Sequence, residues 1–370
     1  MDETPPHEPD PRAAWNRFVD GLRAAGDQLA ADTDELDPIQ RADAFRSLLR
    51  AVNNMLGRFE VDRERPELVA FNGWRQKMFM DNPDFRYWVA DIHDDRRYRI
   101  TGAVGDAVFQ SVTVYAGTGP LRATSVARVD SDTIAFDEDG RFDLTLSPDR
   151  PTDGSDWLEL PEGSTALWVR QFHHDARSDR LGWCDVVALD DAAAPPSIDP
   201  MGFDADLTRM ASGLSMLPML WDAAVRDDVA EPNAVRRWSE MAGGAAYTEP
   251  DISYLRGSWD LEDDEALVVE GTPPPSRYWN VLLYSRFLNS LDHRARSVSR
   301  TDGTATLDGG RYRFVISGTD PEAAAPGFVG DWLDTEGRPF GLFVFRFLQP
   351  ITEPDLPTVR RCRITDLQER

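Results

Sequence analysis

One short charged segment in the second half of the chain holds the residue types best suited to chemistry. Residues 292–296 read Asp-His-Arg-Ala-Arg, so a carboxylate, an imidazole and two guanidinium groups stand close together. Such a set can transfer a proton or bind an anion. Asp334 stands in a second acidic turn further along. We therefore predict that Asp292, His293 and Asp334 are catalytic. The alternative is a solvated charged loop, because Asp and Glu are abundant throughout the chain.

Arginine and aromatic side chains in the same half could hold a substrate. We predict this role for four of them: Arg277, Trp279, Arg296 and Trp332. Glycoside hydrolysis needs two carboxylates roughly 5 to 10 Å apart and aromatic rings that stack on the sugar. The sequence supplies both, which favours a hydrolase with acid–base chemistry and a small polar or carbohydrate-like substrate. Trp279 and Trp332 are equally explained as packing residues.

Motifs for cofactors and metals are missing from the sequence. There is no Gly-x-Ser-x-Gly elbow, no Gly-x-Gly-x-x-Gly loop and no Walker-type loop. The two cysteines form no Cys-x-x-Cys pair, and no His-x-His occurs. His173 and His174 follow a predicted strand, where adjacent side chains point to opposite faces. We therefore predict neither a cofactor nor a metal.

The charge of the chain argues against two classes of partner. The formal net charge is −25, and Lys77 is the single lysine. A basic stripe, which nucleic acid and anionic membranes require, is absent. No apolar run reaches the ~18 residues that span a bilayer. The acidic, proline-rich start lacks the features of a secretory signal, so we expect a cytoplasmic protein.

The spacing of apolar residues predicts helices before the β-rich regions. Residues 13–29 and 38–56 have helical periodicity, and so does the stretch 200–248. We expect the apolar stripes of the first two helices to face the core: Trp15, Phe18, Val19, Leu22 and Leu29 in one, and Phe45, Leu48, Leu49, Val52 and Leu56 in the other. From Tyr98, and again from Tyr254, short alternating segments between Gly, Asp and Pro turns predict antiparallel strands.

Several β segments occur twice in the same order. Residues 109–115 match 278–284, and residues 140–147 match 310–317. Asp156-Trp157-Leu158 matches Asp331-Trp332-Leu333, and Leu167, Val169 and Phe172 then match Leu342, Val344 and Phe347. We interpret this echo as an internal duplication. The Asp-Trp-Leu triplets are predicted to be turns, with Asp capping the turn and Trp covering a sandwich edge.

The sequence thus predicts a mainly β fold with helical additions: two related jelly-roll-like β-sandwich units, a helical N-terminal region and a helical connector. The expected boundaries are a disordered tail (1–11), a helical region (12–95), the first sandwich (96–195), the connector (196–250), the second sandwich (251–350) and a C-terminal tail (351–370).

The second half also resembles a known family. The segments 261–285, 311–321 and 330–347 are similar to the domain-of-unknown-function 1214 family, and 82–102 is similar to the segment before its β region. The resemblance implies a β-rich, jelly-roll-like fold. It implies no activity and no catalytic residues, because the family is defined without a function.

Two functions remain open from the sequence. The first is an enzyme, a hydrolase whose site lies in a cleft between the two sandwiches. The second is a non-catalytic protein that binds a ligand or assembles as a homo-oligomer through edge strands. A concave pocket with convergent polar groups and an ionisable side chain in apolar surroundings would favour the enzyme. A flat apolar patch without such a set would favour the binding or assembly protein.

Overall fold

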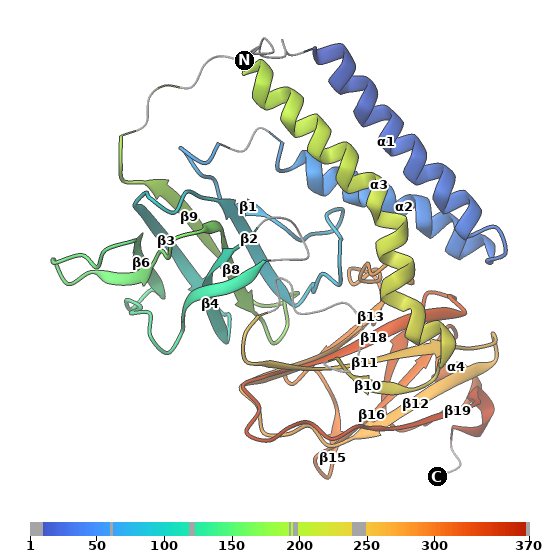
Figure 1. Ribbon diagram of the computed structural model, residues 1–370. Coiled ribbons are helices and arrows are strands. Elements are labelled where there is room, and N and C mark those ends of the chain that lie inside the picture. The colour runs from blue at the N-terminus through green and yellow to red at the C-terminus, as the bar shows by residue number, and fades with distance from the viewer. Residues whose placement is uncertain are drawn as a thin grey trace.

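The computed structural model describes residues 10–59, 62–117, 123–191, 194, 199–238 and 249–367. Its strands form two units, with the long helices along one side (Figure 1). Unit 1 contains β1 to β9: Val69–Ala70, Phe85–Asp91, Tyr98–Gly105, Phe109–Ala116, Thr124–Asp130, Arg141–Ser147, Asp156–Glu159, Ser164–Phe172 and Leu181–Ala188. Unit 2 contains β10 to β19: Val235–Arg237, Ile252–Asp260, Glu265–Gly271, Tyr278–Tyr284, Ser299–Thr301, Leu307–Asp308, Arg311–Ser317, Asp331–Asp334, Phe340–Leu348 and Thr358–Arg363.

The two units share one topology. The five-stranded sheet of unit 1 has the order β1-β2-β8-β4-β5, and that of unit 2 has the order β10-β11-β18-β13-β14. In the second sheets, β6-β3-β9 corresponds to β16-β12-β19, and the short strands β7 and β17 pair parallel to β6 and β16. This repetition confirms the predicted duplicated, mainly β fold. The strands β2, β10 and β19 lie within the stretches 12–95, 196–250 and 351–370, respectively.

Strand pairing corrects part of the predicted echo. Phe109 pairs with Phe172 across β4 and β8, and the equivalent Tyr278 pairs with Leu348 across β13 and β18. Phe172 therefore corresponds to Leu348, not to Phe347. The connection between β17 and β18 is one residue longer than that between β7 and β8. A one-residue slip moves side chains to the opposite face of a strand, so the predicted matches of Leu167 and Val169 were also wrong.

The Asp-Trp-Leu triplets are strands, which corrects the predicted turns. Their side chains still act alike. Asp156 Oδ2 accepts from the backbone N–H of Ala135 at 2.8 Å, and Asp331 Oδ2 accepts from that of Thr306 at 2.6 Å. The indole N–H of Trp157 donates to the Ser147 carbonyl, and that of Trp332 to the Ser317 carbonyl. These bonds fix the short parallel strand at the sheet edge in both units.

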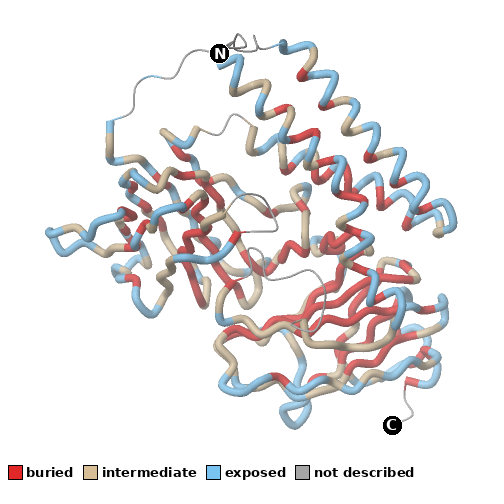
Figure 2. Tube along the Cα trace, in the orientation of Figure 1, coloured by how far each residue is buried: buried red, intermediate tan, exposed pale blue. Residues whose placement is uncertain are grey.

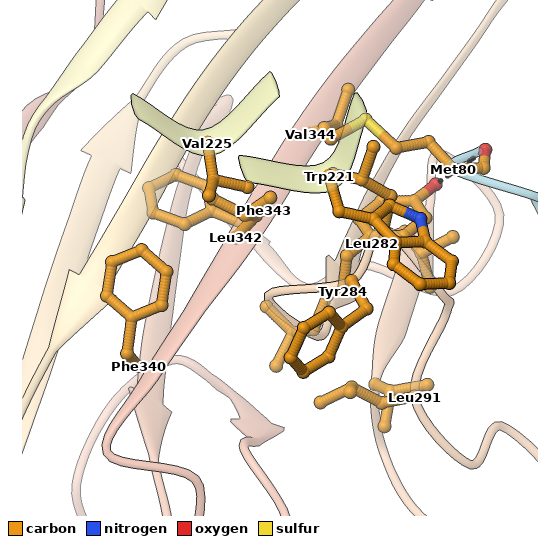
Figure 3. Packing of buried hydrophobic residues seen from close by; sticks show 14 of the residues in the cluster. Met80, Trp221, Val225, Leu282, Tyr284, Leu291, Phe340, Leu342, Phe343 and Val344 are labelled. Carbon is orange, nitrogen blue, oxygen red and sulfur yellow. Dashed lines mark hydrogen bonds between the residues drawn. The ribbon is translucent and has the colours of Figure 1, made fainter. Parts of the chain in front are cut away.

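Three long helices cover the sheets: α1 (Pro11–Asp32), α2 (Pro38–Leu56) and α3 (Pro200–Ala230). Each begins with proline after an aspartate N-cap. α1 runs along α3 (Figure 1), so closely that a Cβ on Gly21 would meet the Ala211 carbonyl oxygen at 2.8 Å. The side chains of Trp221 and Val225 of α3 lie over the five-stranded sheet of unit 2 (Figure 3). No helix of the described residues is long and apolar enough to span a membrane.

Only part of the predicted apolar stripe of α2 faces the core: Leu48 and Val52 pack there, whereas the other three residues do not. Leu49 is 64% exposed, and Phe45 and Leu56 are exposed as well, whereas the adjacent Leu48 is 4% exposed. The buried face carries polar side chains: Asp43, Ser47, Arg50 and Asn54. Asp43 lies 3.4 Å from the buried guanidinium of Arg338, which holds this polar face inward. Trp15 of α1 is also exposed. Figure 2 shows the resulting exposed outer surface of the helices.

The predicted helical stretch 200–248 is shorter in the structure. α3 ends at Ala230, and residues 235–237 form β10 at the edge of a sheet. Residues 239–248 lie outside the described part of the chain. The short helix α4 (Pro321–Ala324) lies in the loop between β16 and β17.

Candidate functional site

Two of the three predicted catalytic residues, Asp292 and Asp334, are linked through Glu336. The backbone N–H of Asp292 donates to the Glu336 side chain, and the backbone N–H of Glu336 donates to Asp334 Oδ1 at 2.7 Å. Arg296 Nη1 donates to Asp334 Oδ2 at 2.6 Å. The loops 285–298 and 335–339 thus bring Asp292, His293 and Asp334 into one region, which we call the loop cluster. Asp334 is buried and committed to this ion pair.

His293 is the ionisable side chain of the loop cluster best placed to accept a proton. Burial, and then the positive charge of Lys77, lower its pKa to about 4, so the imidazole is neutral near pH 7. Its Nδ1 atom is buried and has no hydrogen-bond partner within the described residues. The guanidinium of Arg177, from unit 1, donates to the carbonyls of His293 and Arg296 at 2.7 and 2.9 Å. The loop cluster therefore lies where the two units meet.

Lys77 belongs to the same region and was missed by the sequence analysis. Its ammonium is fully buried and donates to the carbonyls of Ser290 and Leu291, both at 2.7 Å. Burial lowers its pKa to about 8. The sequence did distinguish this residue, because Lys77 is the single lysine among 40 basic residues. The lysine holds the loop that carries His293.

The other predicted binding residues are engaged elsewhere. Trp279 is buried among Tyr312, Phe314 and Phe347 in the core of unit 2. The Trp332 indole donates to the Ser317 carbonyl at the sheet edge. Arg277 Nη1 donates to Asp132 of unit 1 at 2.6 Å. Nothing in this geometry supports sugar stacking by either tryptophan.

The two best-defined cavities lie away from the loop cluster. One is an open surface groove of about 420 Å³ at the end of unit 1, lined by Asp95, Arg96, Arg97, Pro148, Asp149 and Asp190. The other, of about 20 Å³, lies between α1, α3 and the residues Arg286 and Phe287. Neither is lined by Asp292, His293 or Asp334. No group of His, Cys, Asp and Glu able to hold a metal occurs in the described residues.

A second set of ionisable groups lies between the two five-stranded sheets. Corrected strand pairing makes Arg170 of β8 equivalent to Arg346 of β18. Arg170 Cζ lies 5.9 Å from the ring of Tyr87 and 5.6 Å from that of Tyr115. Arg346 Cζ lies 5.8 Å from the ring of Tyr254 and 5.6 Å from that of Tyr284. Cations over aromatic faces at this distance are stabilised by the ring quadrupole.

The two arginines belong to one interface. Tyr87 interacts electrostatically with both of them, and so does Tyr254. Around them, Phe85, Phe109 and Phe172 of unit 1 pack against Tyr278 and Leu348 of unit 2. The cations are therefore enclosed by aromatic surface where the two units meet.

Each unit sends one segment across this interface to the other. Asn82-Pro83-Asp84 precedes β2, and Glu249-Pro250-Asp251 precedes β11 at the equivalent place. The Asn280 side chain of unit 2 donates to Asn82 Oδ1 at 3.2 Å and to Asp84 Oδ2 at 3.0 Å. In the reciprocal contact, Ser111 of unit 1, equivalent to Asn280, donates to Glu249 Oε2 at 2.9 Å.

One substitution makes the two halves of the interface electrostatically different. We call Arg170, Tyr87, Tyr115 and Glu249 site 1, and Arg346, Tyr254, Tyr284 and Asn82 site 2. At site 1, Arg170 Nη1 lies 2.9 Å from Glu249 Oε2, and Arg128 Nε lies 2.9 Å from the other oxygen. At site 2 the carboxylate is replaced by the amide of Asn82. No carboxylate of the described residues lies within 4 Å of the Arg346 guanidinium.

Site 2 is left with unsatisfied donors. Arg346 Nη2 donates to the Met80 carbonyl at 3.1 Å, but its Nη1 has no hydrogen-bond partner within the described residues. Asn82 Nδ2 is also unsatisfied. The amide cannot simply be flipped, because Asn82 Oδ1 already accepts from the backbone N–H of Asp84 at 3.0 Å. A buried polar atom without a partner is costly, and these two donors lie beside an equally unsatisfied acceptor, Asn280 Oδ1.

The backbone beside Arg346 is also unusual. Phe79 and Met80 have φ values of 47° and 62°, which residues other than glycine adopt uncommonly. The Met80 carbonyl accepts from both Arg346 and the Tyr284 hydroxyl, the latter bond being drawn in Figure 3. Strained backbone of this kind concentrates at functional sites.

The protonation states at site 2 follow from burial. Burial raises the pKa of Tyr87 well above its usual value and that of Tyr254 to about 12, so both phenols are neutral. Burial raises the pKa of Asp84 to about 6, although Asn280 and Ser299 donate to it. Burial alone would lower the pKa of Arg346, but the surrounding phenol oxygens raise it, and the guanidinium keeps its charge.

The sequence held a signal for this site. Residues 82–87 read Asn-Pro-Asp-Phe-Arg-Tyr, and residues 249–254 read Glu-Pro-Asp-Ile-Ser-Tyr. That echo, and a shift of the β8 match by one residue, place Arg170 opposite Arg346. The Asp-Trp-Leu triplets precede the extra residue of the β17–β18 connection, so the offset between the triplets does not hold for β8 and β18.

Fold and site together define a duplicated β-sandwich protein with a buried arginine–tyrosine centre between its two units. The family described as "Protein of unknown function (DUF1214)" matches residues 89–175 and 260–352, one segment in each unit. The chain belongs to this family, as the resemblance of its second half predicted.

Two solved structures are similar to the whole chain. An uncharacterized protein from Burkholderia cenocepacia is 26% identical, with a TM-score of 0.84, over 95% of this chain and 97% of that one. The VPA0106 protein from Vibrio parahaemolyticus is 12% identical, with a TM-score of 0.50, over 93% and 100%. The second likeness shows the fold alone. No curated protein matches the chain.

Proposed function

We propose that the protein binds a small, negatively charged molecule between its two β units, with Arg346 as the recognising charge. The observation that carries this proposal is that the buried Arg346 guanidinium makes no ion pair with a carboxylate of the described residues, Asp84 acting on it only at longer range, whereas Arg170 at the equivalent site 1 pairs with Glu249. Buried cations in proteins are usually paired, because an unpaired charge in apolar surroundings is costly. An anionic ligand would supply the missing partner.

Two further features support a ligand site. Tyr87 and Tyr254 are partly buried residues whose phenols are kept neutral by burial, so they offer an apolar and hydrogen-bonding wall. The Arg346 Nη1 atom itself is covered. Binding therefore requires one of these partly buried tyrosines to turn aside, which predicts slow association. The strained Met80 backbone keeps the guanidinium in place.

Isothermal titration of the full chain against small organic acids, phosphate esters and uncharged sugars tests this proposal. Wild-type protein should bind at least one anionic compound, and Arg346→Gln should weaken that binding by 100-fold or more, at about 1.4 kcal/mol per tenfold. Arg346→Lys, which keeps the charge, covers the case in which the first variant does not fold. Arg361→Gln, on the exposed strand β19, is the matched control. If uncharged sugars bind as well to Arg346→Gln as to wild type, the charge is not the recognition element.

A second candidate function is the hydrolase predicted from the sequence, with the loop cluster as its site. It is favoured by one observation: a neutral His293 with a buried, unpartnered Nδ1, linked through its loop to Asp292 and Asp334. An imidazole in this state can accept a proton as a general base. In this function Asp292 orients the loop, and Arg296 holds Asp334 or a substrate anion.

Turnover of a panel of nitrophenyl glycosides and esters distinguishes this candidate. If His293 is the base, His293→Ala removes turnover by 100-fold or more, while Arg361→Gln leaves it unchanged. If the protein turns over none of these compounds but still binds an anion at Arg346, binding is the function and catalysis is not.

Assembly as a homo-oligomer is the third proposal retained from the sequence. The exposed stripe of Phe45, Leu49 and Leu56 on α2 supports it more directly than the edge strands do. Light scattering of wild-type protein and of Leu49→Glu is the test. A wild-type monomer would remove the proposal.

A further inference from the structure

At site 1 the Glu249 carboxylate occupies a place that no carboxylate occupies at site 2. The contacts of Glu249 therefore indicate which chemical group would fit at site 2. The Glu249 carboxylate accepts from Ser111 Oγ and Arg170 Nη1, both at 2.9 Å, and lies 2.9 Å from Arg128 Nε. All these partners except Arg128 are buried, and Arg128 is mostly so. The duplication maps Ser111 to Asn280, Arg170 to Arg346 and Glu249 to Asn82.

We infer that the molecule bound at site 2 is recognised through a carboxylate group, which takes up the position between Arg346 and Asn82 that the Glu249 carboxylate holds between Arg170 and Ser111. This inference rests on the proposed function and specifies its ligand class. Glu249 is then an internal stand-in for the ligand, and site 1 is a closed copy of site 2.

The donor set at site 2 fits a carboxylate. Arg346 Nη1 and Asn82 Nδ2 are each without an acceptor, and both residues are more than nine-tenths buried. A carboxylate has two oxygens and can accept from both donors at once, with the geometry that guanidinium groups favour. Asparagine is one methylene shorter than glutamate, so the chain itself does not fill the place at site 2.

The surroundings also restrict the rest of the ligand. Aromatic rings flank Arg346. The Asp84 carboxylate, just before β2, accepts from Asn280, and no cation of the described residues lies within ion-pair distance of it. A monocarboxylate with an apolar or aromatic body therefore suits the site better than a multiply charged phosphate, whose second charge would face Asp84.

Benzoate is a suitable probe, with benzamide as its neutral analogue and phenyl phosphate as a different anion of similar shape. The thermal midpoint of wild-type protein should rise by about 2 °C or more with saturating benzoate. It should not rise with benzamide. The double variant Asn82→Glu, Ser299→Arg copies site 1 into site 2, because Ser299 is the equivalent of Arg128. Its midpoint should be raised without ligand and should no longer respond to benzoate.

Chemical rescue at site 1 tests the stand-in independently. Glu249→Ala should lower the midpoint, and added acetate should restore at least half of the loss, while acetamide should restore none. Glu249→Gln replaces it if the alanine variant does not fold, with benzoate expected to compete for Arg170.

The outcomes separate the two proposals. If phenyl phosphate stabilises wild type and benzoate does not, anion binding stands and the carboxylate inference is overturned. If acetate rescues Glu249→Ala but no anion affects wild type, site 1 behaves as inferred and the proposed function fails. If acetate and acetamide rescue equally, Glu249 is not a carboxylate stand-in.

Discussion

The two halves of the interface have the same backbone plan but different charge balance. At site 1 the chain supplies a carboxylate for Arg170, and at site 2 it supplies only the amide of Asn82 for Arg346. The two tyrosine rings at each site lie at distances that agree within about 0.1 Å, whereas the Trp168 ring, 4.8 Å from Arg170, has Val344 as its equivalent at site 2. The comparison teaches that the fold requires the arginine and its rings in both units, but requires the carboxylate in only one.

The largest expected effect comes from breaking the ion pair at site 1. Glu249→Gln should lower the free energy of unfolding by about 3 to 5 kcal/mol, because it leaves two guanidinium groups facing a neutral amide inside the protein. Urea unfolding measures this. The control is Glu265→Gln, which breaks an exposed pair with Arg361 and should cost less than about 1 kcal/mol. Equal costs for the two variants would mean that site 1 gains nothing from its carboxylate.

The second prediction concerns pH and Asp84 at site 2. Its pKa is about 6 in the folded protein against 3.8 ordinarily, so the folded state binds the proton more tightly. The contribution of Asp84 to stability is therefore full below pH 3.8 and is lost as the pH rises through 6. The loss is on the order of 3 kcal/mol.

Urea unfolding of wild type and Asp84→Asn between pH 3.5 and 7.5 measures this loss. The difference between the two proteins should shift in favour of the variant as the pH rises. Taking the difference is necessary because His293, with a lowered pKa of about 4, contributes in the opposite sense between pH 4 and 6.5. A difference that does not change with pH would show that Asp84 is ionised throughout.

The third prediction compares the two arginines directly. Arg170→Met should cost at least about 2 kcal/mol more than Arg346→Met, because only the first leaves a buried carboxylate without its cation. Methionine fills a similar volume in both places, so the packing cost is matched. Calorimetry of both variants without added anions gives the comparison. A larger cost for Arg346→Met would show that its charge already has a partner.

The smallest expected effect is at the rim of site 2. Ser299→Arg would give Asp84 an arginine partner in place of the present Ser299 contact. The equivalent pair at the rim of site 1 joins Arg128 and Asp251 at 2.7 Å. The change in unfolding free energy at pH 7 should stay within about 1 kcal/mol and be stabilising, since the position is partly exposed. Destabilisation would mean that the two rims are not equivalent.

The register of β18 shows where sequence reasoning stops. Both Phe347 and Leu348 are apolar and buried, so the apolar pattern of the strand does not favour one as the match of Phe172. The alternation that normally fixes register is missing in a strand that is buried on both faces. Only the hydrogen-bonded pairing with β13 selects Leu348, and with it the equivalence of the two arginines.

The predicted orientation of helix α2 was partly wrong for a related reason. Periodicity identifies an amphipathic helix, and the predicted stretch 38–56 coincides with α2. Periodicity does not show which face of the helix turns inward when the core contains polar partners for its polar face. Arg338, distant in sequence, draws Asp43 inward and leaves Leu49 exposed.

The sequence by itself determined most of the strands, the three long helices and the duplication, because these depend on local periodicity and on repeated segments. The tertiary structure alone decided which charges meet. Arg346, Asn82 and Asn280 are far apart in the chain, and their unsatisfied atoms exist only because two sheets enclose them away from water. Whether a charged side chain is paired is a property of its three-dimensional surroundings, and composition cannot report it.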